Sequence, residues 1–254
     1  MGKLKDLASV KSTNASNFAY LPPDTAFDAM RVLVKPQLDY SSESPASVSL
    51  DILGAVLRGL RRATPLGRIV VVDGITSDKG VEAVFEELGI ISLLDREMRI
   101  TDADNLIMHE YPNLLAEPMI YESMTASEYI KDYDCVISLG AFKSTSQNDK
   151  VEISASLKNL MSIFPQEKYQ DDFASANIDD LLTDIYFTVG HHIDGAVIDL
   201  SQKYVGEDNV AHAVGRVVWG DDLLAVDEVA CQFADEPVPD YIETIRKRRK
   251  TLAR

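Results

Sequence analysis

The sequence of 254 residues contains only two cysteines, Cys135 and Cys231, and they lie far apart in the chain. Neither belongs to a Cys-x-x-Cys pair, so the sequence offers no zinc ribbon and no ligand set for an iron–sulfur cluster. Each cysteine stands among apolar residues. This setting predicts two buried free thiols, which fit a reducing compartment.

Long hydrophobic runs are also missing. No apolar stretch approaches the roughly 18 residues that are needed to span a bilayer. The N-terminal segment carries lysines but lacks the apolar core of a secretory signal peptide. These absences predict a cytoplasmic protein that does not enter a membrane.

Basic residues are scarce relative to acidic ones, with 25 Lys and Arg against 41 Asp and Glu and a formal net charge of −16. Such a charge repels nucleic acid and anionic membranes, because binding to phosphate depends on lysine and arginine. We therefore expect neither as a partner.

Several common nucleotide and nucleophile motifs are absent as well. The sequence contains no P-loop, no G-x-G-x-x-G fingerprint and no G-x-S-x-G elbow. Classical ATP or dinucleotide binding and a Ser-His-Asp nucleophile therefore lack support from the sequence.

What the sequence does contain is an alternation of strand-like and helical segments. Runs rich in Val and Ile, continuous rather than alternating, predict strands covered on both faces. Amphipathic segments between them predict helices, so the order favours βαβ units in an α/β fold with a largely parallel or mixed sheet flanked by helices. The expected strands are 30–36, 67–74, 134–140, 195–200 and 215–222, and the expected helices are 49–63, 78–90, 223–235 and 240–254.

The segments between these elements do not mark a domain boundary. We expect a single α/β domain over residues 1–254, in one body or two lobes. Residues 1–29 form an N-terminal extension and residues 240–254 a basic C-terminal helix.

Lysines follow two of the predicted strands. Lys35 closes one strand, Lys143 follows another, and Lys158 lies early in the next predicted helix. Ligands of open α/β sheets bind beyond the carboxyl ends of parallel strands, so these ammonium groups predict a site for phosphate or carboxylate. The alternative is that they are solvated or paired with the many acidic residues nearby.

Residues 151–165 predict a short helix with one apolar stripe, and Lys158 and Asn159 fall off that stripe. This pair is either the solvent-facing side of a core helix or part of a site. Asn159 could orient a bound anion through a directional amide hydrogen bond.

A second candidate lies in the predicted helix 223–235, with Asp222 as its N-cap. Asp227 falls within the apolar arc of this helix. A lone buried carboxylate costs several kcal/mol unless it is paired, hydrogen-bonded or protonated. We expect Asp227 to contact a lysine or a group of backbone N–H donors, either as an acid–base residue or as a structural carboxylate that caps a neighbouring loop.

The pair His191 and His192, with Asp194 close behind, is the weaker candidate for a metal site. Adjacent side chains in extended backbone point to opposite faces, so both histidines bind one metal only if the loop bends. Solvated or capping histidines are the alternative.

The basic run 246–250 opposes the overall charge of the chain. It complements its own helix C-terminus and the acidic body, or it docks an acidic protein partner.

Taken in order, the segments VLVKP, SDKGVEAVFEELGI, YDCVISLGAFK, SASLKNLMSIFP, GAVIDL and GDDLLAVDEVA resemble the domain-of-unknown-function family 362 (DUF362). The resemblance runs from about Arg31 to Ala234. It implies that the family's motif positions are Lys35, Lys143, Lys158, Asn159, Asp222 and Asp227.

The resemblance supplies no reaction, because the family is known mainly as uncharacterised. Many members carry an added cysteine-rich, ferredoxin-like segment that this chain lacks, so no iron–sulfur ligands are expected here and the cofactor is unknown. Two motif positions also depart from the family. The histidine expected after Lys143-Ser144 is Thr145, and the glycine that closes the Lys-Asn motif is Ser162.

The sequence thus predicts that a small anionic molecule binds at the strand ends. Lys35, Lys143 and Lys158 would neutralise it, with Asn159 and Asp222 completing the binding set, and Asp227 with Lys143 would supply acid–base catalysis. The alternatives are a non-catalytic accessory protein of an iron–sulfur, redox or cofactor-assembly system, and a metal-dependent hydrolase or lyase. Whether the chain is an enzyme is left open.

Overall fold

A computed structural model of the chain describes residues 10–38, 47–74, 81–147, 150–206 and 210–252. Its main element is an eight-stranded sheet in the order β1-β10-β9-β7-β2-β3-β4, with β8 paired to β7, and a separate two-stranded sheet joins β5 to β6. The strands are β1 (Lys11–Asn14), β2 (Arg31–Pro36), β3 (Arg68–Asp73), β4 (Met98–Asp102), β5 (Met108–Pro112), β6 (Ser123–Ser127), β7 (Cys135–Gln147), β8 (Lys150–Ser154), β9 (Gly195–Val205) and β10 (Val210–Gly220).

The centre of the large sheet is parallel and its additions are antiparallel. Strands β9, β7, β2, β3 and β4 run in one direction, each parallel to its neighbour. Strands β10, β1 and β8 pair antiparallel with theirs. The fold is therefore α/β with a mixed sheet, as the sequence predicts.

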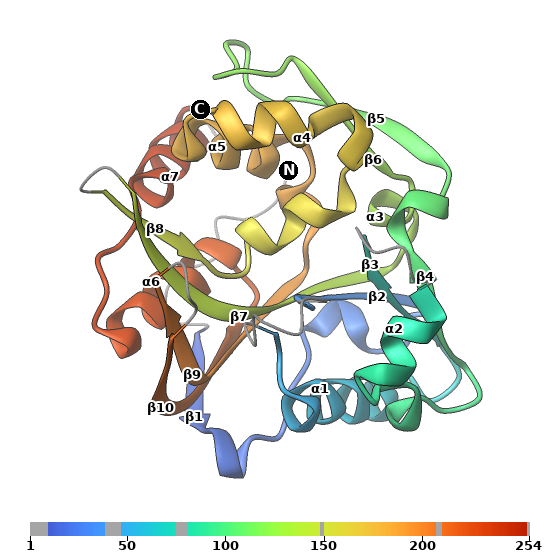
Figure 1. Ribbon diagram of the computed structural model, residues 1–254. Coiled ribbons are helices and arrows are strands. Elements are labelled where there is room, and N and C mark those ends of the chain that lie inside the picture. Colours follow the sequence, from blue (N-terminus) through green and yellow to red (C-terminus); the bar gives the residue numbers. More distant parts are fainter. Residues whose placement is uncertain (1–9, 39–46, 75–80, 148–149, 207–209, 253–254) are drawn as a thin grey trace.

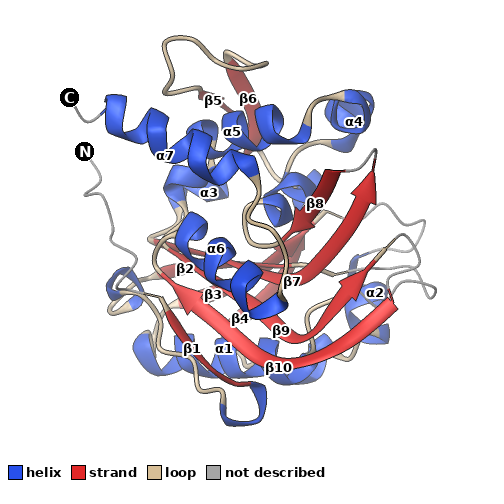
Figure 2. Cartoon of the chain, turned by 90° about the vertical axis from the view of Figure 1, so that its left-hand side faces the viewer, coloured by secondary structure: helices blue, strands red, loops and turns tan. Residues whose placement is uncertain are grey.

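Helices cover both faces of this sheet (Figures 1 and 2). Helices α1 and α2 lie on one face, whereas α5, α6 and α7 lie on the other. The helices are α1 (Leu50–Ala63), α2 (Val81–Glu87), α3 (Tyr129–Asp132), α4 (Gln166–Ser175), α5 (Ile178–Thr188), α6 (Leu223–Ala234) and α7 (Asp240–Leu252). Short 3-10 segments are η2 (Ala15–Asn17), η3 (Asp24–Ala26), η4 (Ile90–Leu93), η5 (Ala103–Asn105), η6 (Lys158–Ile163) and η7 (Gly190–His192).

Continuous apolarity in the central strands arises because both faces are buried. In β2, Val32 and Val34 enter the core beneath α1, and Leu33 enters the core on the α5–α6 side. Alternate residues of an extended chain point to opposite faces, so a strand with two covered faces needs apolar residues at consecutive positions. The strands predicted from such runs are all present.

Helix α1 matches its amphipathic pattern and charge distribution. Asp51 stands in its first turn and Arg61 and Arg62 in its last, which complements the helix dipole at both ends. The other predicted helices are also present, as α2, α6 and α7.

The structure differs from the sequence prediction in residues 151–165. The first part of this segment is strand β8, whose residues Val151–Ser154 pair with β7, and only residues 158–163 are helical, as the 3-10 segment η6. The apolar spacing fits a helix, but hydrogen bonding to β7 determines the conformation of the first part.

The chain termini extend the fold beyond the central βαβ units. Part of the predicted N-terminal extension is strand β1, which pairs with β10 at the edge of the sheet. The predicted basic helix is α7.

Both cysteines are buried and free, as the sequence predicts. In the described ranges, no helix combines the length and the apolarity that a membrane crossing requires.

Candidate functional site

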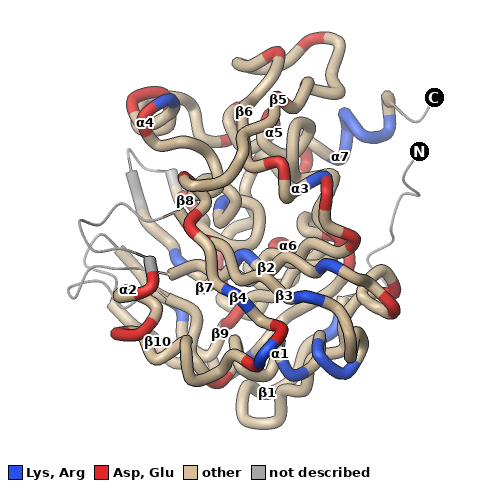
Figure 3. Tube along the Cα trace, turned by 90° about the vertical axis from the view of Figure 1, so that its right-hand side faces the viewer, with Lys and Arg blue, Asp and Glu red and all other residues tan. Residues whose placement is uncertain are grey.

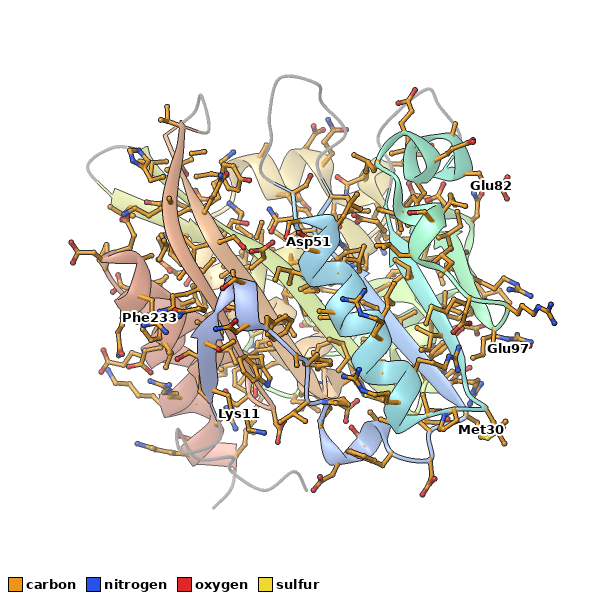
Figure 4. All side chains as sticks on the ribbon, turned by 90° about the horizontal axis from the view of Figure 1, so that it is seen from below. Lys11, Met30, Asp51, Glu82, Glu97 and Phe233 are labelled. Carbon is orange, nitrogen blue, oxygen red and sulfur yellow. The ribbon has the colours of Figure 1, made fainter. Side chains whose placement is uncertain are left out.

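The parallel strands β2, β3 and β7 end at the same edge of the sheet, which we call the carboxyl edge. From β2 the chain passes through α1 to β3 on one side, whereas from β7 it passes through α4 and α5, on the opposite face, to β9 on the other side. Adjacent strands with diverging connections form a topological switch point, where ligands of open α/β sheets bind. Figure 4 marks the two edges: Asp51 lies toward the carboxyl edge, and Met30 toward the opposite one.

A buried polar group at the carboxyl edge, which we call the inner cluster, consists of Lys35, Asp73, Ser138, Asn159 and Ser162. The Lys35 ammonium lies 2.7 Å from Asp73 Oδ1, and both side chains are 2% exposed. It also donates to Asn159 Oδ1 at 3.0 Å and to the carbonyl oxygen of Pro36 at 2.6 Å. An ammonium has three donors, so these partners occupy all of them.

Burial lowers the pKa of Lys35, and the neighbouring Asp73 carboxylate opposes that shift. The positive charge of Lys35 and the negative charge of Asp73 therefore neutralise each other inside the protein. Lys35 holds the structure together at this point and presents no donor to solvent.

The inner cluster also fixes η6 on the sheet. The Asn159 amide donates to the Lys35 carbonyl oxygen at 2.9 Å and to Ser138 Oγ at 3.0 Å. Ser162 Oγ donates to Asp73 Oδ1 at 2.8 Å. Ser162 thus ties the end of η6 to β3.

Two glycines allow the chain to approach this closely. A Cβ at Gly74 would lie 2.1 Å from the carbonyl oxygen of Ser162, and one at Gly140 would lie 3.1 Å from that of Ala155. A side chain at Gly74 would clash with the η6 backbone, whereas one at Gly140 would need the backbone at Ala155 to move by a few tenths of an ångström.

A second group, which we call the outer cluster, consists of Lys143, Lys158 and Glu152. In the β7–β8 pair, Lys143 is opposite Ser154 and Thr145 is opposite Glu152, which makes Lys143 and Glu152 diagonal neighbours on one face. The Lys158 ammonium forms an ion pair with the Glu152 carboxylate, and these two side chains are 24% and 22% exposed.

The outer cluster carries two positive charges and one negative charge. Burial first, and the charge of Lys143 second, lower the pKa of Lys158 to about 8. Within the described ranges, Lys143 makes no ion pair with an acid. The outer cluster is therefore a half-buried site with an excess of positive charge in an acidic protein.

Asp227 is fully buried beneath η6. Its carboxylate accepts hydrogen bonds from the backbone N–H of Ser156 at 2.8 Å and of Leu157 at 3.2 Å, and from the hydroxyls of Ser156 at 2.6 Å and Tyr241 at 3.1 Å. Of the two kinds of partner expected for Asp227, a lysine or backbone N–H donors, the structure shows the backbone donors, and no lysine is among its partners in the described residues. Asp227 caps the chain just before Lys158.

Desolvation by burial raises the pKa of Asp227, and its hydrogen bonds oppose the shift without cancelling it. Of the two roles expected for Asp227, the structural carboxylate that caps a neighbouring loop fits these contacts best. It positions η6 from the far side and does not face the lysines.

Asp222 lies away from the lysines. It caps α6 by accepting from the N–H of Ala225 at 3.1 Å, as predicted, and its other oxygen lies 2.7 Å from Arg249 Nη1. Strand β10 runs antiparallel to β9, with Gly220 opposite Ala196, so Asp222 follows β10 at the edge opposite the carboxyl ends of β2 and β7. The prediction grouped Asp222 with the lysines, and the antiparallel direction of β10 places it at the other edge instead.

The histidine pair does not form a metal site in the structure. The rings of His191 and His192 are 4.1 Å apart, His192 packs edge-on against Tyr111, and Asp194 accepts from the N–H of Val136. Burial and the neighbouring His192 lower the pKa of His191 to about 4. Across the residues that the structure describes, no group of three or more His, Cys, Asp or Glu side chains is arranged to hold a metal ion.

The basic residues of α7 serve mainly the protein itself. Arg246 lies 2.5 Å from Glu228, and Arg249 pairs with Asp222 and lies over the ring of Tyr186. Lys247 is 71% exposed and pairs within the helix with Glu243. Figure 3 shows the concentration of positive residues in the last turns of α7. The simpler expectation, complementing the acidic body, accounts for both paired arginines.

Three members of the inner cluster were not among the predicted site residues: Asp73, Ser138 and Ser162. Asp73 lies at the end of a predicted strand, which is a signal that could have found it. Ser138 lies within a strand and Ser162 within η6, so only the tertiary structure brings them together.

A comparison with curated proteins finds no match. The model of a family described as a domain of unknown function, DUF362, matches residues 32–232. These residues include the inner cluster, the outer cluster and Asp227, and they span most of the chain. The chain belongs to the DUF362 family.

Proposed function

We propose that this protein binds a small carboxylate or phosphate at the carboxyl edge of β7, beside Lys143 and Lys158. The observation that carries the proposal is the outer cluster, in which Lys158 pairs with Glu152 while the neighbouring Lys143 has no acidic partner among the residues that the structure describes. An anion placed there would balance the remaining positive charge.

The location supports this proposal. The outer cluster lies next to the switch point between β2 and β7, where the chain leaves the sheet in opposite directions. Because the net charge of the protein is −16, an anion is repelled by most of its surface. The local excess of positive charge at the outer cluster would therefore attract an anion to this place, whereas the rest of the surface repels it.

Lys35 and Asn159 support the site without contacting the anion. All donors of the Lys35 ammonium and both N–H groups of the Asn159 amide are directed at protein acceptors. Their task in this proposal is to hold η6, and with it Lys158, in a fixed position.

Any acid–base step at this site would fall to Lys158. Its pKa of about 8 lies close to neutral pH, where an acid–base group works best. Asp227 is fully buried and committed to four hydrogen bonds, so it acts by positioning.

The test is a titration of the full-length protein with acetate and, separately, with inorganic phosphate, followed by NMR chemical shifts. Lys143→Gln and Lys158→Gln should each weaken binding by about tenfold, because each removes a partly desolvated charge contact of about 1–2 kcal/mol. The affinity of the wild type should fall as salt is added.

Lys247→Gln is the matched control. It removes the same charge from an exposed position on α7 and should leave the affinity unchanged. Equal losses in all three variants would indicate a general charge effect and would contradict a defined site. The same holds if neither anion shifts resonances near Lys143 or Lys158.

A further inference from the structure

The chemistry of Lys158 extends beyond holding an anion. Its amine is half-buried, lies beside a second ammonium group and contacts a carboxylate. Lysines that form Schiff bases are typically activated by desolvation or by a neighbouring cation, because only the neutral amine is a nucleophile. Both conditions are met at this position.

We infer that Lys158 is a nucleophilic amine that forms an imine with the carbonyl group of a 2-oxo acid whose carboxylate pairs with Lys143. This inference rests on the proposed function, since the same outer cluster binds the carboxylate. It adds the chemical class of the ligand: an anion with a carbonyl carbon next to its carboxylate.

The protonation state of Lys158 supports this step. With a pKa of about 8, about one tenth of the Lys158 amine is neutral at pH 7. A lysine at the ordinary value of 10.5 would be neutral in roughly one molecule in three thousand. Lys158 is therefore far more often ready to attack than an exposed lysine.

Glu152 supplies the proton transfers that imine formation needs. Its carboxylate accepts a proton from the Lys158 ammonium, and the free amine then attacks the carbonyl carbon. The carbonyl electron pair moves to oxygen, which takes up the proton that the attacking nitrogen loses, to give a neutral carbinolamine. Protonated Glu152 then donates to this hydroxyl, water leaves and the protonated imine remains beside the Glu152 carboxylate. One water molecule is released, and no oxidant or reductant takes part.

The charge of the ligand matches the cluster. Lys143 and Glu152 are diagonal neighbours on one face of the β7–β8 pair, and the Lys158 ammonium forms an ion pair with Glu152. A ligand carboxylate on Lys143 would therefore bring a neighbouring carbonyl carbon toward Lys158. A simple carboxylate such as acetate would bind in the same place without reacting.

The experiment is borohydride trapping on the full-length protein. Pyruvate, glyoxylate and 2-oxoglutarate are each incubated with the protein, sodium borohydride is added, and the modified peptide is identified by mass spectrometry. For pyruvate the adduct has the mass of pyruvic acid minus one oxygen atom. We expect it on Lys158 of the wild type, with a trapping rate that rises with pH and has its midpoint near 8.

The variants separate a specific amine from general lysine reactivity. Lys143→Gln should reduce trapping on Lys158 by about tenfold, because the carboxylate contact is lost and the pKa of Lys158 rises. Lys247→Gln should change nothing, and lactate, which has no carbonyl group, should give no adduct. Peptide mapping of the wild type needs no variant, so the result stands even if Lys158→Gln does not fold.

Two results would overturn the inference. One is the absence of an adduct on Lys158 with all three oxo acids. The other is an adduct spread equally over Lys158 and exposed lysines such as Lys247. If acetate still shifts resonances at the outer cluster in either case, only the imine chemistry fails. If acetate does not bind either, the proposed function fails with it.

Discussion

The inner and outer clusters both contain a lysine near the carboxyl edge of the sheet, but their charges are balanced in different ways. Lys35 is 2% exposed and meets Asp73 within 2.7 Å, so one charge cancels one charge. In the outer cluster Lys158 pairs with Glu152, whereas Lys143 makes no ion pair within the described ranges, and both lysines remain half-buried. The comparison teaches that a lysine at a strand end is structural or available depending on its counter-charge and not on its position.

The two clusters are also mechanically connected. Lys158 and Asn159 are adjacent residues of η6, with Lys158 in the outer cluster and Asn159 in the inner cluster. Rigid support from the inner cluster therefore determines where the outer cluster places its ammonium group. The variants below test this division of roles.

The largest effect is expected from Asp73→Ala. It leaves the Lys35 ammonium buried without its counter-charge, which should lower the free energy of unfolding by about 3–5 kcal/mol. Urea denaturation measures this change. The double variant Lys35→Met with Asp73→Leu should cost less than Asp73→Ala alone, because it removes both charges. A double variant that is less stable than the single one would show that the ion pair itself is the stabilising element.

Asp227→Ala should come next, with a loss of about 2–3 kcal/mol, because two backbone N–H groups and two hydroxyls lose their acceptor. It should also weaken acetate binding, although Asp227 does not face the anion, since η6 loses its support. Unchanged acetate affinity in a folded Asp227→Ala protein would show that the Asp227 contacts are not needed to hold Lys158 in place.

The pH dependence of Asp227 provides a further check. Burial raises its folded pKa above the ordinary value of 3.8, so its contribution to stability is fully present below about 4 and is lost as the pH rises through the folded pKa. Compared with Asp227→Asn, which does not titrate, the wild type should lose stability as the pH rises from 4 towards 7. A difference that grows in the opposite direction would show that the hydrogen bonds outweigh desolvation.

Asp222→Ala should cost about 1–2 kcal/mol, because α6 loses its N-cap and Arg249 its partner. Acetate affinity should not change, since Asp222 lies at the opposite edge of the sheet. A parallel titration of this variant and the wild type measures both quantities. Weaker acetate binding by this variant would show that Asp222 affects the outer cluster from the opposite edge of the sheet.

Glu152→Gln should have the smallest effect and the opposite sign. Without its counter-charge, the outer cluster should bind acetate about threefold to tenfold more tightly at low salt. NMR titration at two salt concentrations can measure this gain. An affinity that decreased would mean that Glu152 positions Lys158 more than it neutralises it.

The sequence predicted those features that depend on local pattern. Continuous apolar runs located the central strands, and the position of Asp227 within an apolar arc predicted that it has a partner, either a lysine or backbone N–H donors, of which the structure shows the second. Local pattern does not contain the direction in which a strand joins the sheet, so Asp222 was grouped with the lysines at the wrong edge.

The inner cluster could be predicted only in part for a related reason. Lys35 and Asn159 were both candidates, but their contact joins residues far apart in the sequence, and its effect is to remove Lys35 from the surface. Whether a lysine meets an acid such as Asp73 depends on how neighbouring strands are ordered. That order is a property of the whole fold.

Strand β1 and helix α7 both lie outside residues 32–232, the segment that the family model matches. A shortened protein that kept only that segment would leave β10 as an unpaired sheet edge and would remove the Tyr241 hydroxyl from Asp227. Such a fragment should aggregate when expressed. Anyone who isolates this protein for crystallisation should therefore retain at least residues 10–252.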